Sequence, residues 1–178
     1  MNTTDNSHWQ KLSPSDGHYF FGYYDRIPWN HDNSLHLTLK APQCERLPLP
    51  GETAEIGIID WNTGKYKGLT ETRAWCHQQG SMTLWLQHRP ECFIYNDLDE
   101  STGQLRAKIF SLQDGFSGSY DRPVYAMSPD GRYGASLNFA RIPRRGYSYA
   151  DAALEPARNR RRTQGPVVFV ECRRRGPA

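Results

Sequence analysis

The sequence predicts an all-β protein, a partial β-propeller of four-stranded antiparallel blades followed by an irregular basic C-terminal tail. Aromatic residues make up 12% of the chain while long apolar helical stripes are missing, which favours strands. Short alternating segments are separated by turn residues, and the order of turn types recurs about every 50 residues, close to the period of a propeller blade. An antiparallel sandwich has strands at similar spacing and is the alternative architecture.

Length and composition indicate one globular domain. The chain has 178 residues, 37% of them hydrophobic, which is enough for a core. No apolar run is long enough to span a membrane and residues 1–8 do not resemble a signal peptide, so we expect a cytoplasmic location. The four cysteines are irregularly spaced without a Cys-x-x-Cys pair, which favours reduced thiols over a zinc or redox site.

The first blade is expected between residues 19 and 70. Residues 40–53 contain three prolines and are predicted to form a loop, and Gly64 allows the positive φ of a turn before the last strand. Aromatic, leucine and β-branched residues predict the four strands, at residues 19–24, 35–39, 56–59 and 66–70.

A second blade starts at residue 81, and a third begins near Val124 with a hairpin over residues 125–139. The hairpin turn reads SPDG at residues 128–131, where proline fixes φ, aspartate can bond its own backbone and glycine tolerates positive φ. The second blade has a predicted turn at residues 88–91 and strands at 82–87, 92–96, 105–110 and, more weakly, 117–120. These units amount to about two and a half blades, whereas closed propellers use about 4 to 8.

The pattern breaks near residue 151. Residues 152–178 contain seven arginines against two glutamates, no lysine and one strand-like run at 167–170, while residues 1–151 are mildly acidic. We therefore expect a flexible lead-in (1–17), the partial propeller (18–151) and an arginine-rich tail (152–178), which is disordered or out of frame in a truncated propeller. The alternative is a genuine basic arm that binds nucleic acid, but it lacks interleaved aromatic residues and a reading motif.

The turn SPDGRY at residues 128–133 resembles the repeat signature of the TolB-type, WD40-like propellers, a group that includes the oligogalacturonate lyases. A longer set of segments resembles a family of uncharacterised bacterial propeller proteins: HYFFGYYD (18–25), WCHQQG (75–80), YND (95–97) and residues 125–141. The resemblance covers about residues 17–151 and implies a propeller fold. It is weakly specific for function, because propellers include enzymes, scaffolds and carbohydrate-binding proteins.

The predicted site lies on the propeller face where the loops after the second and fourth strands of each blade meet. Clustered amide, imidazole and charged groups there suit a hydroxylated or carboxylated sugar, with Tyr23, Trp75 and Tyr125 available for ring stacking. The candidate ligand-binding residues are His18, His77, Gln78, Gln79, Asn96, Asp97, Arg122, Asn138 and Arg141.

Each candidate also has a structural interpretation. The histidines can be structural hydrogen-bonding groups, the Asn96-Asp97 pair can open a turn, and Trp75 with Tyr125 can be core. The arginines can pair with acidic neighbours. The two glutamines before Gly80 have the least obvious structural reason and are the strongest pointer to a site.

The leading functional prediction is carbohydrate binding or processing by a chain that is not catalytic on its own. The alternatives are a protein-interaction scaffold and nucleic-acid binding by the tail; no membrane partner is expected. Similarity to the lyases would imply β-elimination of a uronate with a divalent metal and a base. No histidine follows His88 to complete a lyase-type metal cluster, so we assign no metal ligand, cofactor or catalytic residue. Nucleophile-elbow, Walker, dinucleotide and His-Glu-x-x-His motifs do not occur.

Overall fold

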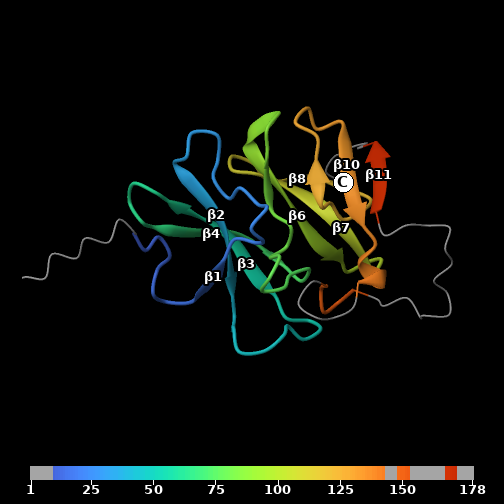
Figure 1. Ribbon diagram of the computed structural model, residues 1–178, viewed down its shortest axis with the longest axis horizontal. Helices are drawn as coiled ribbons and strands as arrows, with labels where there is room; N and C mark the ends of the chain where they lie inside the picture. Colours follow the sequence, from blue (N-terminus) through green and yellow to red (C-terminus); the bar gives the residue numbers. More distant parts are fainter. Residues whose placement is uncertain (1–9, 143–147, 153–166, 172–178) are drawn as a thin grey trace, which may run out of the picture.

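The computed structural model describes residues 10–142, 148–152 and 167–171, with the last five described as backbone only. Among these residues the protein is all-β, with three antiparallel sheets and one short 3-10 helix, Phe139–Arg141. Figure 1 shows the first sheet in blue and teal, the second in green and yellow, and the third in orange and red. The all-β class predicted from the sequence is therefore confirmed.

The first two sheets are four-stranded meanders in which each strand pairs with the next one along the chain. The first sheet has the order β1-β2-β3-β4, with β1 (His18–Phe20), β2 (Leu35–Ala41), β3 (Ala54–Asp60) and β4 (Tyr66–Thr72). The second has the order β5-β6-β7-β8, with β5 (Leu84–Leu86), β6 (Arg89–Asp99), β7 (Gln104–Ser111) and β8 (Gly115–Tyr120). Two successive four-stranded antiparallel units agree with the sequence prediction.

The third sheet begins with the predicted hairpin. Its strands are β9 (Ala126–Met127), β10 (Tyr133–Leu137) and β11 (Val167–Glu171), and β10 lies between the other two. The turn closes through a hydrogen bond from Gly131 N to Ser128 O of 2.9 Å, and Gly131 has a φ of +70°. The strand-like run near the chain end thus pairs with β10; the rest of the predicted tail falls outside the described residues, apart from Ala152.

Several strand boundaries differ from the prediction; β6, for example, ends at Asp99 rather than at residue 96, and the differences in β1 and β5 have a local reason. β1 ends at Phe20 because Gly22 has a φ of +119°, so the expected strand over 19–24 is too long. β5 begins at Leu84, because Met82 has a positive φ of +56° and cannot extend the strand. The expected turn at 88–91 is also displaced, since β6 starts at Arg89 and Pro90 lies within it.

The middle sheet is packed on both faces because successive side chains of a strand point in opposite directions. Phe93 and Tyr95 of β6 belong to a core shared with the first sheet, and Cys92 and Ile94 belong to a second core. The first core adds Leu37, Leu39, Ala41, Ala54, Ile56 and Trp75. The second adds Leu86, Ala107, Ile109, Tyr120 and Val124.

A third core joins the ends of the sheets. Phe139 and Tyr149 stack with ring centroids 4.5 Å apart, and Met82 and Ala152 complete the cluster with Ala74. Tyr149 and Ala152 are almost completely buried, so the described residues 148–152 belong to the packed interior.

Candidate functional site

Asn96 is a structural residue of the interior. Its side chain is completely buried, donates from Nδ2 to Val124 O and to the Tyr149 hydroxyl, both at 2.9 Å, and accepts from Val124 N at 2.7 Å. The amide thus ties β6 to the chain segment that precedes the third sheet. Both N–H groups and the oxygen of this side chain therefore bond to protein groups.

Asp97, the next residue, holds the link after β4. One carboxylate oxygen accepts from Arg73 N at 2.9 Å, and the other pairs with Lys108 Nζ at 2.6 Å. The carboxylate is largely buried, and a buried charge is tolerated when it is paired and hydrogen-bonded in this way. Asp97 also lines a groove, described below.

The segment after β4 contains the three predicted residues His77, Gln78 and Gln79, all half-buried. His77 Nε2 lies 2.8 Å from Gln43 O, and its ring lies edge-on to Trp75 at 5.2 Å, so it fastens the long β2–β3 loop. Gln79 accepts a bond from Met82 N through its backbone oxygen. Its side-chain Oε1 is buried and accepts no hydrogen bond from any described residue.

The remaining predicted residues lie apart along the chain. His18 is exposed at the start of β1, and Arg122 is exposed in the link between β8 and β9. Asn138 caps the short 3-10 helix, where its side chain accepts from Ala140 N at 3.1 Å. Arg141 ends that helix, and its side chain lies outside the described residues.

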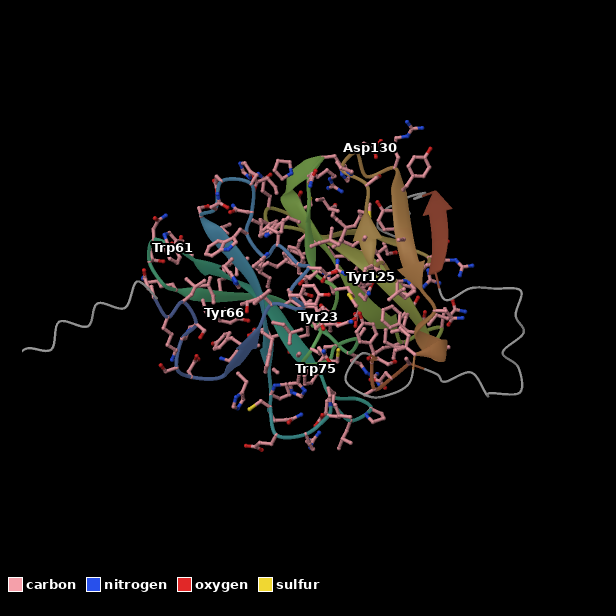
Figure 2. All side chains as sticks on the ribbon, in the orientation of Figure 1. Tyr23, Trp61, Tyr66, Trp75, Tyr125 and Asp130 are labelled. Carbon is pink, nitrogen blue, oxygen red and sulfur yellow. The ribbon has the colours of Figure 1, made fainter. Side chains whose placement is uncertain are left out.

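All three predicted stacking rings make contacts within the protein, and the Tyr23 ring lies against that of Tyr24 with centroids 4.3 Å apart. Trp75 is completely buried, and its indole nitrogen donates to Glu52 O at 2.9 Å, as in the core interpretation. The guanidinium of Arg26 lies over the Tyr125 ring, 4.3 Å from the ring centroid. In Figure 2, Tyr23 and Tyr125 lie near the centre of the molecule, whereas Trp61 and Asp130 lie at its periphery.

The first groove has a volume of about 520 Å³ and lies next to the β2–β3 and β6–β7 connections. We call it the charged groove; it is lined by Glu71, Arg73, Asp97, Asp99, Arg106 and Lys108, among others. Its cations are already paired: Arg106 with Asp99 and Asp121, Lys108 with Asp97, and Arg73 with Glu100 and Asp151. These pairs hold neighbouring strands together.

The second groove, of about 390 Å³, lies at the opposite ends of the strands. We call it the tryptophan groove, and it is lined by Asp25, Arg26, Trp29, His31, Trp85 and Gln87, together with apolar residues of β5 and β9. Both indole rings are held in place. Trp85 Nε1 donates to Pro28 O at 2.8 Å, and Trp29 packs edge-on against His36 and Trp61, at 4.9 and 5.6 Å.

A polar network forms one wall of the tryptophan groove. Arg26 donates from Nη1 to Tyr125 O at 2.6 Å, and the Tyr125 hydroxyl donates to Asp25 Oδ2 at 2.9 Å. Burial, and then the bond to Asp25, raise the pKa of Tyr125, so its hydroxyl stays protonated as a donor. Asp25 keeps 37% of its side-chain area exposed while Arg26 keeps 9%. The Asp25 carboxylate can therefore accept from a ligand.

Sequence reasoning missed the tryptophan groove because it placed the site on the other face. Asp25 and Arg26 follow the strand predicted at residues 19–24, and nothing in the local pattern shows that Tyr125, about one hundred residues later, completes their network. A usable signal was present in residues 18–31, where two acidic or basic side chains follow an aromatic run and precede Trp29.

Within the described ranges, no group of three or more His, Cys, Asp or Glu side chains is arranged to hold a metal ion. In the same residues no helix has the length and apolarity needed to cross a membrane. No protein-family model matches the sequence, and a search of curated proteins finds no match.

Proposed function

We propose that this chain is part of a β-propeller and binds a carbohydrate in the tryptophan groove. The propeller is supported by the repetition of the four-stranded meander and by the face-to-face stacking of the three sheets in chain order. In a propeller the first strands of the blades surround a central channel. Here β5, β9 and the loop after β1 all line the tryptophan groove, as that arrangement requires.

The observation that carries the carbohydrate proposal is the pairing of two fixed indole rings with a carboxylate in one groove. Trp29 and Trp85 offer apolar surfaces for the C–H faces of a pyranose, while Asp25 and Gln87 offer hydrogen-bonding groups for its hydroxyls. Because hydrogen bonds already orient Trp85 and Asp25, binding needs little reordering of these side chains.

The charge balance of the groove favours a sugar without a strong net charge. Asp25 and Arg26 lie side by side, with Arg26 Nε 3.5 Å from Asp25 Oδ1, so their charges largely offset each other. A charged ligand would therefore gain little electrostatic energy from this pair. The hydroxyl groups of a sugar both donate and accept hydrogen bonds, so they can bond to both members of the pair.

The test is a titration of the folded protein with a panel of neutral and acidic oligosaccharides, followed by calorimetry and tryptophan fluorescence. Asp25→Asn and Gln87→Ala are expected to weaken binding roughly tenfold each, because each removes one polar contact of the sugar. Glu71→Gln in the charged groove is the matched control and is expected to leave the affinity unchanged. Absence of binding across the panel, or loss in the control but not in Asp25→Asn, overturns the proposal.

A further inference from the structure

The tryptophan groove is lined by segments that belong to all three sheets. Its lining residues fall within the loop after β1 (25–31), the segment around β5 (84–90) and the hairpin of the third sheet (126–129). Its volume of about 390 Å³ is that of a site for a drug-sized ligand, which is larger than one sugar ring. The groove therefore has room for more than a single pyranose unit.

The two indole rings of the groove are fixed by different parts of the protein. Trp85 lies edge-on to Phe93 of β6, with ring centroids 5.9 Å apart. Trp29 lies edge-on to His36 of β2 and to Trp61, which follows β3. Because each ring has its own neighbours, the two indoles offer separate apolar surfaces to a ligand.

The loop along one side of the groove also carries strongly exposed apolar side chains. Tyr24 is 84% exposed and Ile27 is 77% exposed, more than any other large hydrophobic residue in the described part of the chain. Ile27 lines the groove, and Tyr24 directly precedes Asp25, which lines it as well. The Cα atoms of Tyr24 and Asp25 are about 3.8 Å apart, so Tyr24 lies at the rim of the groove.

The Tyr24 ring is held in place although it is exposed. Arg26 N donates to Tyr23 O at 2.9 Å and closes a turn that has Tyr24 and Asp25 at its corner. Arg26 in turn donates from Nη1 to Tyr125 O at 2.6 Å, which anchors the turn to the third sheet. The Tyr23 ring supports that of Tyr24, with centroids 4.3 Å apart. A ring that is already restrained loses little entropy when a ligand stacks on it.

The chemistry of this rim suits a sugar. A tyrosine ring has an apolar face and a hydroxyl at its edge, so it can contact both the C–H face and a hydroxyl group of a pyranose. The Asp25 carboxylate, which is 37% exposed, lies between the rim and the groove and can accept from a sugar hydroxyl on either side. Ring, carboxylate and indoles thus follow one another along the protein surface.

We infer that the ligand of the tryptophan groove is an oligosaccharide of at least two pyranose units, and that Tyr24 is the platform for a unit outside the groove. The inference rests on the proposed function and specifies its ligand as a chain of linked sugars instead of a monosaccharide. One unit lies against the indole rings. The chain then passes Asp25 and Ile27, and a further unit stacks on the Tyr24 ring.

The experiment measures affinity as a function of chain length. Glucose, cellobiose and cellotriose form one series, and mannose with its β-1,4-linked di- and trisaccharides forms another. Each sugar is titrated into the full chain, and binding is followed by tryptophan fluorescence and calorimetry. In at least one series we expect affinity to rise roughly five- to tenfold from the monosaccharide to the longer sugars, the gain of about one aromatic stacking contact.

Substitutions of exposed aromatic residues test the assignment to Tyr24. Tyr24→Ala is expected to abolish the gain with chain length while the affinity for the monosaccharide stays unchanged, and Tyr24→Trp is expected to keep the gain. Phe116→Ala is the control, because Phe116 is an exposed aromatic residue, 49% accessible, that lines the charged groove instead. It should bind every sugar as the wild type does. Urea unfolding of each variant confirms that it is folded.

The outcomes separate this inference from the proposed function. Equal affinity for the monosaccharide and its oligomers overturns the oligosaccharide inference and leaves sugar binding in the groove intact. A gain with chain length that survives Tyr24→Ala in a folded protein, or that is lost equally in Phe116→Ala, also overturns it. Failure of every sugar to bind removes the proposed function and the inference together.

Discussion

The side-chain amide of Asn96 donates to the Tyr149 hydroxyl at 2.9 Å across 53 positions of sequence, with both residues completely buried. This bond fastens β6 to residues 148–152, of which Tyr149 and Ala152 belong to the third core. Burial and the loss of hydration that goes with it raise the pKa of Tyr149, so the phenol stays neutral at any pH at which the protein folds.

Removal of this amide is expected to be strongly destabilising. Asn96→Ala leaves Val124 N, Val124 O and the Tyr149 hydroxyl without their buried partner, and we expect a loss of about 2 to 4 kcal/mol in the free energy of unfolding. Tyr149→Phe removes only one of these bonds and should cost about 1 kcal/mol. Urea unfolding measures both. A loss below about 0.5 kcal/mol in Asn96→Ala would contradict a structural role.

Arg73 has two acidic partners that differ in burial, which gives a matched pair of substitutions. Asp151 keeps 8% of its side-chain area exposed, accepts from Arg73 Nη2 at 2.9 Å and also accepts from Gly51 N, whereas Glu100 is 77% exposed. We expect Asp151→Ala to destabilise the protein by about 1 to 3 kcal/mol and Glu100→Ala by less than about 0.5 kcal/mol. Thermal and urea unfolding in low and high salt distinguish the two. Equal losses would mean that burial does not set the strength of these pairs.

Substitution of two glycines with similar backbone conformations distinguishes the cost of backbone strain from the cost of crowding by a neighbouring side chain. Gly131 has a φ of +70° and Gly103 a φ of +65°. A Cβ on Gly131 would overlap the His88 ring, while one on Gly103 would meet no atom within 4 Å. Gly103→Ala is expected to cost about 1 kcal/mol for the left-handed conformation, and Gly131→Ala more than that, because His88 must also move. His88→Ala in the Gly131→Ala background should recover the difference, as measured by urea unfolding; no recovery would contradict the contact between the two turns.

His36 is expected to make stability depend on pH. It lies among the rings of Phe21 and Trp29, and its Nδ1 is buried without a partner among the described residues. Burial lowers the pKa of His36 below its ordinary value of 6.5, so the folded state prefers the neutral ring. The stabilisation is complete above that ordinary value and is lost as the pH falls toward the lower pKa of the folded state.

Unfolding free energies measured between about pH 7.5 and pH 5 should therefore fall more in the wild type than in His36→Phe. The variant keeps a ring in the same place and removes the titrating group. Identical pH profiles for the two proteins would show that His36 does not govern the loss. The other four described histidines are present in both proteins, so they cancel in the comparison.

Strand and turn positions could be predicted because their causes are local. The turn at residues 128–131 follows from proline, aspartate and glycine in adjacent positions, and alternation in residues 105–110 follows the pleat of β7. At β1 and β5, where the predicted boundaries were wrong, a single residue was responsible in each case. Gly22 ends β1 early, and Met82 adopts a positive φ that its side chain gives no reason to expect.

The grooves could not be predicted because they depend on residues that are distant in sequence. Asp25 and Tyr125 become neighbours only when the first and third sheets are placed around the second, and Asn96 is buried by residues that follow Val124. The interest in Gln79 was based on the absence of a structural reason for a polar side chain there. The structure adds that its Oε1 is buried with no partner among the described residues.

The packing of β6 against both neighbouring sheets also affects how the protein opens. Residues 92–97 are all buried, and their alternate side chains belong to two different cores, so backbone amides in this strand are exposed only when both cores separate. Hydrogen exchange of these amides should thus report the global unfolding free energy, while amides of the outer strands β4 and β8 exchange through smaller openings. β6 is then the last part of the described fold to exchange with solvent. A ligand that contacts the first strands of all three sheets would slow hydrogen exchange in the three sheets together.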